Sequence, residues 1–69
     1  MITIHLNGEP QTFDPQSPLT VTELLTQFRY PSQGLAVAID GRVIPKSQWA
    51  TTPISTGQAI EIVAPMQGG

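Results

Sequence analysis

The chain has 69 residues, of which 39% are hydrophobic and 12% charged, and it contains no cysteine. This length allows one small domain, and the lack of cysteine excludes disulfide bonds, thiolate metal sites and a catalytic thiol. Three basic residues against five acidic ones give a net charge of −2. Nucleic-acid binding is therefore not expected, because it requires a clustered basic surface to neutralise phosphates.

Hydropathy argues against a membrane location. The longest unbroken apolar run, residues 35–39, is far shorter than the roughly 18 residues of a membrane-spanning segment. The N-terminus also lacks the basic start and apolar stretch of a signal peptide. We therefore expect a soluble, cytoplasmic protein.

The first predicted element is a β-hairpin. Residues 1–6 alternate between apolar and polar side chains, which is the pattern of a strand buried on one face. The Asn-Gly pair at 7–8 is a strong signal for a two-residue turn, because both positions tolerate positive φ. A return strand over residues 9–13 would place Phe13 opposite Ile2 on the same apolar face.

A capping box predicts where the one main helix begins. Thr20 and Glu23 stand three residues apart, so each side chain can accept a hydrogen bond from the other residue's backbone N–H. Leu19 and Leu24 occupy the two positions of a hydrophobic staple.

The helix should present one apolar stripe to the core and be short. Its i, i+3, i+4, i+7 positions are Val21, Leu24, Leu25 and Phe28, which form one face of a helix. Pro31 disfavours helical geometry at Tyr30. We therefore expect the helix to end near Arg29.

Two strands are predicted after the helix. Residues 35–39 do not alternate, which indicates a central strand buried on both faces. The Asp-Gly pair at 40–41 is a second tight-turn signal, and a short strand over 42–44 follows, which Pro45 stops. Residues 46–53 are expected to be irregular or to form a single helical turn.

The last strand is predicted over residues 58–63, after a turn at Gly57. Ile60 and Ile62 would face the core, and Val63 would point the other way. Residues 64–69 show no periodicity, so we expect a domain of residues 1–63 followed by a flexible C-terminal tail.

The order of elements predicts an α+β fold in which one helix packs across a mixed sheet of four or five strands. The first and last strands are expected to be adjacent and parallel, and the helical connection fits the right-handed crossover rule. This arrangement is a β-grasp.

The side chains provide little for catalysis. His5 is the only histidine and is expected on the surface, while the five acidic residues show no paired spacing. Asp40 is interpreted as a turn residue and Glu23 as a cap. Phosphate-binding loops and metal-ligand spacings are absent, and so short a chain has scarcely the volume for a ligand pocket. We expect no enzymatic activity and no bound metal or cofactor.

The C-terminal Gly68-Gly69 pair is the most distinctive feature. Neither residue has a Cβ, so this end is slender enough to enter a narrow channel. The six residues after Val63 can extend at most about 20 Å. A terminal carboxylate is ionised and resists nucleophilic attack, so chemistry at Gly69 would require an acyl-adenylate, with ATP and Mg²⁺ supplied by a partner enzyme.

Several segments resemble the thiamine-biosynthesis sulfur carrier family. They are residues 37–45, Trp49, residues 57–62 and the closing Gly68-Gly69. Members of this family are small ubiquitin-like β-grasp proteins, and the resemblance extends over essentially the whole chain.

The resemblance implies a mechanism in which Gly69 alone is chemically changed and Gly68 provides clearance. A ubiquitin-activating-type adenylyltransferase would join the Gly69 carboxylate to AMP. Sulfur from cysteine, delivered by a desulfurase persulfide, would replace AMP and leave a thiocarboxylate that thiazole synthase consumes. The protein would then be a co-substrate rather than an enzyme, and a monomer when free.

Three alternatives share parts of this pattern. They are a molybdopterin-synthase-type carrier subunit, a ubiquitin-like protein modifier and a non-covalent β-grasp interaction module. Trp49 is interpreted as a plug at one end of the sheet–helix interface, with a partner-docking anchor as the second reading. Val63 and Met66 are candidates for a partner-docking patch beside the tail.

Overall fold

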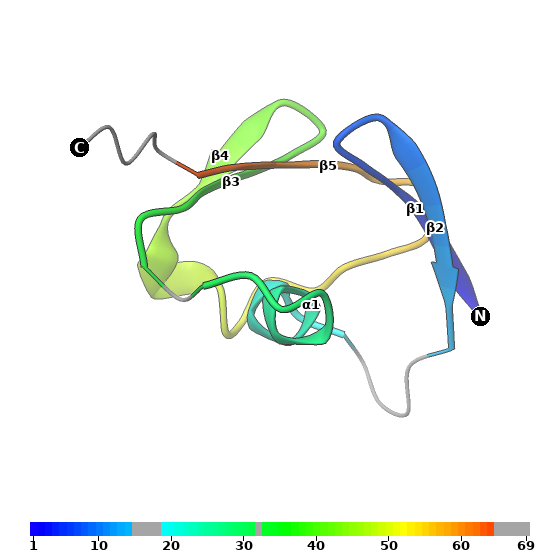
Figure 1. Ribbon diagram of the computed structural model, residues 1–69, viewed down its shortest axis with the longest axis horizontal. Helices are drawn as coiled ribbons and strands as arrows, with labels where there is room; N and C mark the ends of the chain where they lie inside the picture. The colour runs from blue at the N-terminus through cyan, green and yellow to red at the C-terminus, as the bar shows by residue number, and fades with distance from the viewer. Residues whose placement is uncertain (15–18, 32, 65–69) are drawn as a thin grey trace.

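A computed structural model describes residues 1–14, 19–31 and 33–64. In this part of the chain one mixed sheet of five strands, in the order β2-β1-β5-β3-β4, curves over a single α-helix (Figure 1). The α+β architecture predicted from the sequence is confirmed. In chain order the elements are β1 (Ile2–Leu6), β2 (Glu9–Phe13), α1 (Val21–Gln27), β3 (Ala36–Ile39), β4 (Arg42–Ile44), the 3₁₀ turn η1 (Lys46–Gln48) and β5 (Ala59–Val63).

The first hairpin has the predicted register. Ile2 lies opposite Phe13, and the turn residues Asn7 and Gly8 have φ of 51° and 86°. The first and last strands are neighbours and run parallel, as expected, with Leu6 opposite Ile60. β5, the last strand in sequence, therefore lies at the centre of the sheet.

The beginning of α1 is also as predicted. The Thr20 side chain accepts from the Glu23 N–H at 3.3 Å, and the Glu23 carboxylate accepts from the Thr20 N–H at 3.0 Å. The first two helical N–H groups donate to the carbonyls of Thr52 and Trp49. Because those carbonyls belong to the loop before β5, the cap also ties this loop to the helix.

The end of α1 differs from the prediction. The helix stops at Gln27, two residues before Arg29, because the chain forms a Schellman motif. The Tyr30 N–H donates to the Leu25 carbonyl and the Arg29 N–H to the Thr26 carbonyl. Arg29 occupies the left-handed position, with φ of 63°, that glycine usually takes. The turn itself, rather than Pro31, ends the helix.

The prediction of a central strand buried on both faces over 35–39 is wrong. β3 alternates: Val37 and Ile39 are buried, whereas Ala36 is exposed and Ala38 half-buried. Only one face of the sheet is covered by the helix (Figure 1), so the other face of β3 meets solvent. Alanines tolerate that position because their apolar surface is small, and an unbroken apolar run therefore does not require burial on both faces.

The core lies between the helix and the covered face of the sheet. Its fully buried side chains come from four different elements and are Ile4, Val21, Leu24, Val37 and Ile60. Trp49 is 6% exposed, and its Nε1–H donates to the Ile44 carbonyl at 2.9 Å. The interpretation of Trp49 as a plug of the sheet–helix interface is confirmed, and its polar atom has the partner that a buried indole needs.

The second turn and the segment after it agree with the sequence. Asp40 and Gly41 both have positive φ, Pro45 ends β4, and η1 is the single helical turn expected in 46–53. Within the described ranges, no helix is long and apolar enough to cross a membrane.

Candidate functional site

The end of β5 is the part of the fold from which the predicted reactive segment continues. β5 runs between β1 and β3 and ends at the side of the sheet far from the N-terminus (Figure 1). Ile60 and Ile62 are buried, while Val63 is 61% exposed and Ala64 is also exposed. The last strand is therefore anchored in the core up to Ile62, and the chain becomes accessible one residue later.

Three of the predicted site residues lie outside the described residues: Met66, Gly68 and Gly69. Their roles stay predictions. Val63 is within the described part and is exposed on the face of the sheet that the helix does not cover. This position is compatible with the predicted docking role but does not test it.

Val63 lies on the open face of the sheet together with other apolar side chains and with the exposed Glu61, which is opposite Ala38. Val63 itself lies opposite Ala36 on β3, and Ala38 lies opposite Val43 on β4. Val43 is 70% exposed, more than Val63. Val43 is not among the residues predicted to form a docking patch. The position of Val43 between Arg42 and the half-buried Ile44 could have indicated its exposure. Side chains alternate along a strand, so Val43 and Ile44 point to opposite faces of the sheet.

The polar side chains do not gather into an acid–base or metal site. His5 is exposed, as predicted. Over the described ranges, no three potential metal ligands cluster, and the single ion pair joins the N-terminal ammonium to Asp14 at 3.7 Å. Asp40 is a turn residue, as predicted, and its carboxylate also accepts from the Ala59 N–H at 2.9 Å. Each of these groups thus has a structural or solvent-exposed role.

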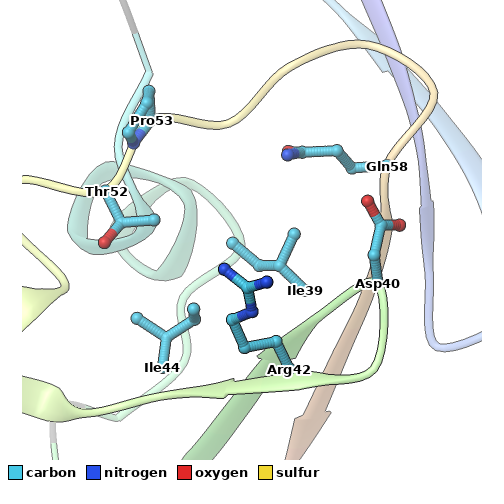
Figure 2. Close-up of a pocket in the computed structure, with 7 residues that line it drawn as sticks. All are labelled: Ile39, Asp40, Arg42, Ile44, Thr52, Pro53 and Gln58. Carbon is cyan, nitrogen blue, oxygen red and sulfur yellow. The ribbon is translucent and has the colours of Figure 1, made fainter.

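The surface of the described domain has a depression that is open rather than enclosed. An open pocket of about 390 Å³ lies between the second hairpin and the loop before β5 (Figure 2). It is lined by Ile39, Asp40, Arg42, Ile44, Thr52, Pro53 and Gln58. Thr52 and Pro53 of this loop line one side of the pocket, and the loop is tied to α1 by the hydrogen bond from the Val21 N–H to the Thr52 carbonyl. The Arg42 side chain is exposed, and the pocket is open to solvent.

The comparison with protein families supplies the decisive observation. The sequence model of the ThiS family matches residues 4–69, nearly the whole chain and the entire predicted tail. The chain belongs to the ThiS family. The resemblance inferred from residues 37–45, 57–62 and the terminal glycines is thereby confirmed.

Individual ThiS-like sequences agree with this assignment. The sulfur carrier protein ThiS of Thermus thermophilus is 32% identical over 96% of this chain and 98% of its own length. An uncharacterized protein, ycf40, of Porphyra purpurea is 31% identical over 99% of this chain and 93% of its own length. A thiazole synthase of Paramagnetospirillum magneticum is 34% identical over 93% of this chain, which corresponds to 19% of that enzyme.

Solved structures of the family match the fold as well. The crystal structure of thiamine biosynthesis protein ThiS from Geobacter metallireducens superposes with a TM-score of 0.84 at 30% identity, covering 99% of this chain and 100% of that one. The solution structure of a thiamine biosynthesis protein from the same organism gives 0.83 at 30% identity, over 99% of this chain and 88% of that one. The five-stranded sheet with one helix is therefore the ubiquitin-like β-grasp of the family.

Proposed function

We propose that this ThiS-family protein carries sulfur for thiamine biosynthesis as a thiocarboxylate on Gly69. The observation that carries the proposal is the family match through residue 69. It is supported by the similarity, over nearly the full length of both chains, to a protein named as a sulfur carrier. The proposal requires that Gly69 end the chain that reacts.

The proposed chemistry takes place in three steps at Gly69, after the end of the folded domain. A ubiquitin-activating-type adenylyltransferase, with ATP and Mg²⁺, converts the Gly69 carboxylate into an acyl-adenylate and releases pyrophosphate. The terminal sulfur of a persulfide on a cysteine desulfurase then displaces AMP. A second thiolate, supplied by a partner, then attacks the desulfurase cysteine sulfur of the resulting acyl disulfide, so that a new disulfide forms and the thiocarboxylate on Gly69 leaves. This chain supplies the carboxylate and its access, and the partners supply the catalytic groups, so we propose that it is a co-substrate and not an enzyme.

Thiazole synthase is the proposed sulfur acceptor. One relative that bears this name contains, within about a fifth of its length, a segment 34% identical to this chain. A carrier-like segment and a thiazole synthase activity in one polypeptide support the pairing of the two functions. Since ATP and the thiazole-forming enzymes are needed together, we propose that the protein works in the cytoplasm.

The geometry of β5 fits delivery of a reactive end into a partner. The core-facing side chains of the strand, Ile60 and Ile62, are buried, and the six residues after Val63 can span at most about 20 Å. Such a reach allows the folded domain to stay outside while Gly69 enters an active site. Gly68, which lacks a Cβ, would keep the segment thin next to the reacting atom.

The mass of the intact protein tests the proposal. The chain is isolated from thiamine-starved cells, and its C-terminal peptide is fragmented. Replacement of one carboxylate oxygen by sulfur on Gly69 is the expected result. A ladder of lysine conjugates would instead indicate a protein modifier, and an unmodified Gly69 that persists under thiamine starvation would contradict the carrier function.

A further inference from the structure

Asn7 lies where the backbone pairing between β1 and β5 should stop. The His5 N–H donates to the Gln58 carbonyl at 2.9 Å, and the Asn7 N–H donates to the Ile60 carbonyl at 2.8 Å. In a parallel ladder the next backbone groups of β5 in line are the N–H and carbonyl of Ile62. However, β1 ends at Leu6, and the chain turns into the hairpin at Asn7 with φ of 51°.

The carboxamide of Asn7 takes over this position in the ladder. Its Oδ1 accepts from the Ile62 N–H at 2.8 Å, and its Nδ2 donates to the Ile62 carbonyl at 3.3 Å. One side-chain amide thus presents an acceptor and a donor to Ile62, as a backbone peptide group of a longer β1 would. Both hydrogen bonds are partly buried, so water has limited access to the Ile62 peptide and leaving it unpaired would be unfavourable.

The turn alone does not require an asparagine. Glycine and aspartate also tolerate positive φ at the first position of such a turn. Of these three residues, only asparagine can both accept from the Ile62 N–H and donate to its carbonyl. The choice of residue at position 7 is therefore explained by its contact with β5.

Ile62 is the last buried residue before the chain becomes accessible. On the other edge of β5, β3 extends to the same level, with Ala36 opposite Val63. We propose that Asn7 is a positioning residue for the C-terminal segment. By holding the Ile62 peptide, it keeps the end of β5 paired on both edges and fixes the direction of the chain at Val63 and Ala64, from which the tail continues. This inference rests on the proposed sulfur-carrier function.

The proposal has a kinetic consequence. Without the carboxamide, the end of β5 would be paired on one edge only, and a partner enzyme would have to order it on binding. This ordering is needed equally for the bound ground state and the transition state, so KM for the carrier should rise while kcat stays the same. The net loss of one hydrogen bond, the 2.8 Å contact to the Ile62 N–H, corresponds to an increase of about three- to tenfold in KM, and the longer 3.3 Å contact contributes less.

Asp40 offers a matched control at the opposite end of β5. It is also the first residue of a tight turn, with φ of 50°, and its carboxylate accepts from the Ala59 N–H at 2.9 Å. Asp40→Gly therefore removes a side-chain contact to β5 and keeps the positive φ, as Asn7→Gly does. The two variants differ in whether the lost contact lies near the C-terminal segment.

The experiment measures ATP–pyrophosphate exchange by the adenylating enzyme as a function of carrier concentration, at a temperature where every variant is folded. Asn7→Gly should raise KM about three- to tenfold with kcat within about twofold of wild type, and Asp40→Gly should leave both nearly unchanged. Equal effects of the two variants, or an unchanged KM for Asn7→Gly, would overturn the proposal.

Amide hydrogen exchange tests the same idea without the enzyme. In the wild type, the Ile62 amide should exchange as slowly as that of Ile60. In Asn7→Gly, the amides of Ile62 and Val63 should exchange about tenfold faster, with no such change in Asp40→Gly. A rapidly exchanging Ile62 amide in the wild type would refute the positioning role. Failure of wild type to support pyrophosphate exchange would instead count against the proposed function.

Discussion

Gly68, which has no Cβ, precedes Gly69, the residue proposed to react. The channel that leads to the active site of the adenylating enzyme can therefore be narrow. Gly68 and Gly69 together let the chain adopt φ values that other residues avoid. Any side chain at position 68 would lie next to the acyl carbon. A substitution at position 68 changes the width of the chain there without changing β5, because this strand ends five residues earlier.

We expect Gly68→Val, and a chain extended by one residue after Gly69, to lose most ATP–pyrophosphate exchange. The extension shifts the carboxylate by about 3.3–3.6 Å, and a misplacement near 1 Å can already lower a positioned reaction about a hundredfold. Thr22→Val is a suitable control, because it places a similar side chain on the exposed surface of α1. Undiminished exchange with the extended chain would remove Gly69 as the reacting residue.

Arg29 gives a second prediction at the residue scale. It holds the left-handed position of the Schellman motif with φ of 63°, a conformation that disfavours residues with a Cβ by about 1–2 kcal/mol. Arg29→Gly should therefore raise the free energy of unfolding by about 0.5–1 kcal/mol, measured by urea denaturation. Gln27→Gly, within the helix, should lower it by a similar amount. A destabilised Arg29→Gly would show that its side chain has a favourable contact.

At the scale of elements, α1 has seven residues and is too short to persist alone. Its stability comes from the capping box at one end and from a buried face formed by Val21, Leu24 and Leu25. The capped end also holds the loop before β5 through the carbonyls of Thr52 and Trp49. The helix packs on the sheet through its buried face, and its first N–H groups hold the loop in place.

We expect Thr20→Ala to lower the free energy of unfolding by about 1 kcal/mol through loss of the cap. Leu24→Ala, at a fully buried position, should lower it by about 2–5 kcal/mol through lost burial and a residual cavity. Chemical denaturation measures both, with the exposed Thr22→Ala as the control. Equal, small effects would contradict the assignment of the buried helix face.

At the scale of the whole molecule, the fold separates a compact scaffold from the segment proposed to react. Every buried hydrophobic side chain of the described part lies between Ile4 and Ile62. The open face of the sheet carries exposed Val63 at the end from which the tail continues and exposed Val43 level with the middle of β5. We therefore expect that the folded domain and residues 68–69 can be altered independently.

Deletion of residues 68–69 should change the free energy of unfolding by less than about 0.5 kcal/mol, as substitutions at surface sites do. The same deletion should abolish ATP–pyrophosphate exchange, because the carboxylate would lie about 7 Å short of its site. Thermal or urea denaturation, compared with the exchange assay, checks both statements. A large loss of stability would mean that the tail packs on the domain.

The structural features that depend only on neighbouring residues could be predicted from the sequence. The hairpin register, the capping box, both tight turns and the alternation of β5 follow from neighbouring residues and were predicted. The terminal glycines and the segments 37–45 and 57–62 were sufficient to point to the ThiS family. These features depend on φ preferences, capping hydrogen bonds and periodicity, which act over a few residues.

Tertiary structure decided the rest. β3 is exposed on one face because the helix covers only one side of the sheet, which an apolar run cannot reveal. Arg29 adopts positive φ in the Schellman motif after which Tyr30 packs against the core. The pocket beside β4 and the contact of Asn7 with Ile62 arise between segments that are distant in sequence. Neither has a local signal, because each depends on which strands become neighbours.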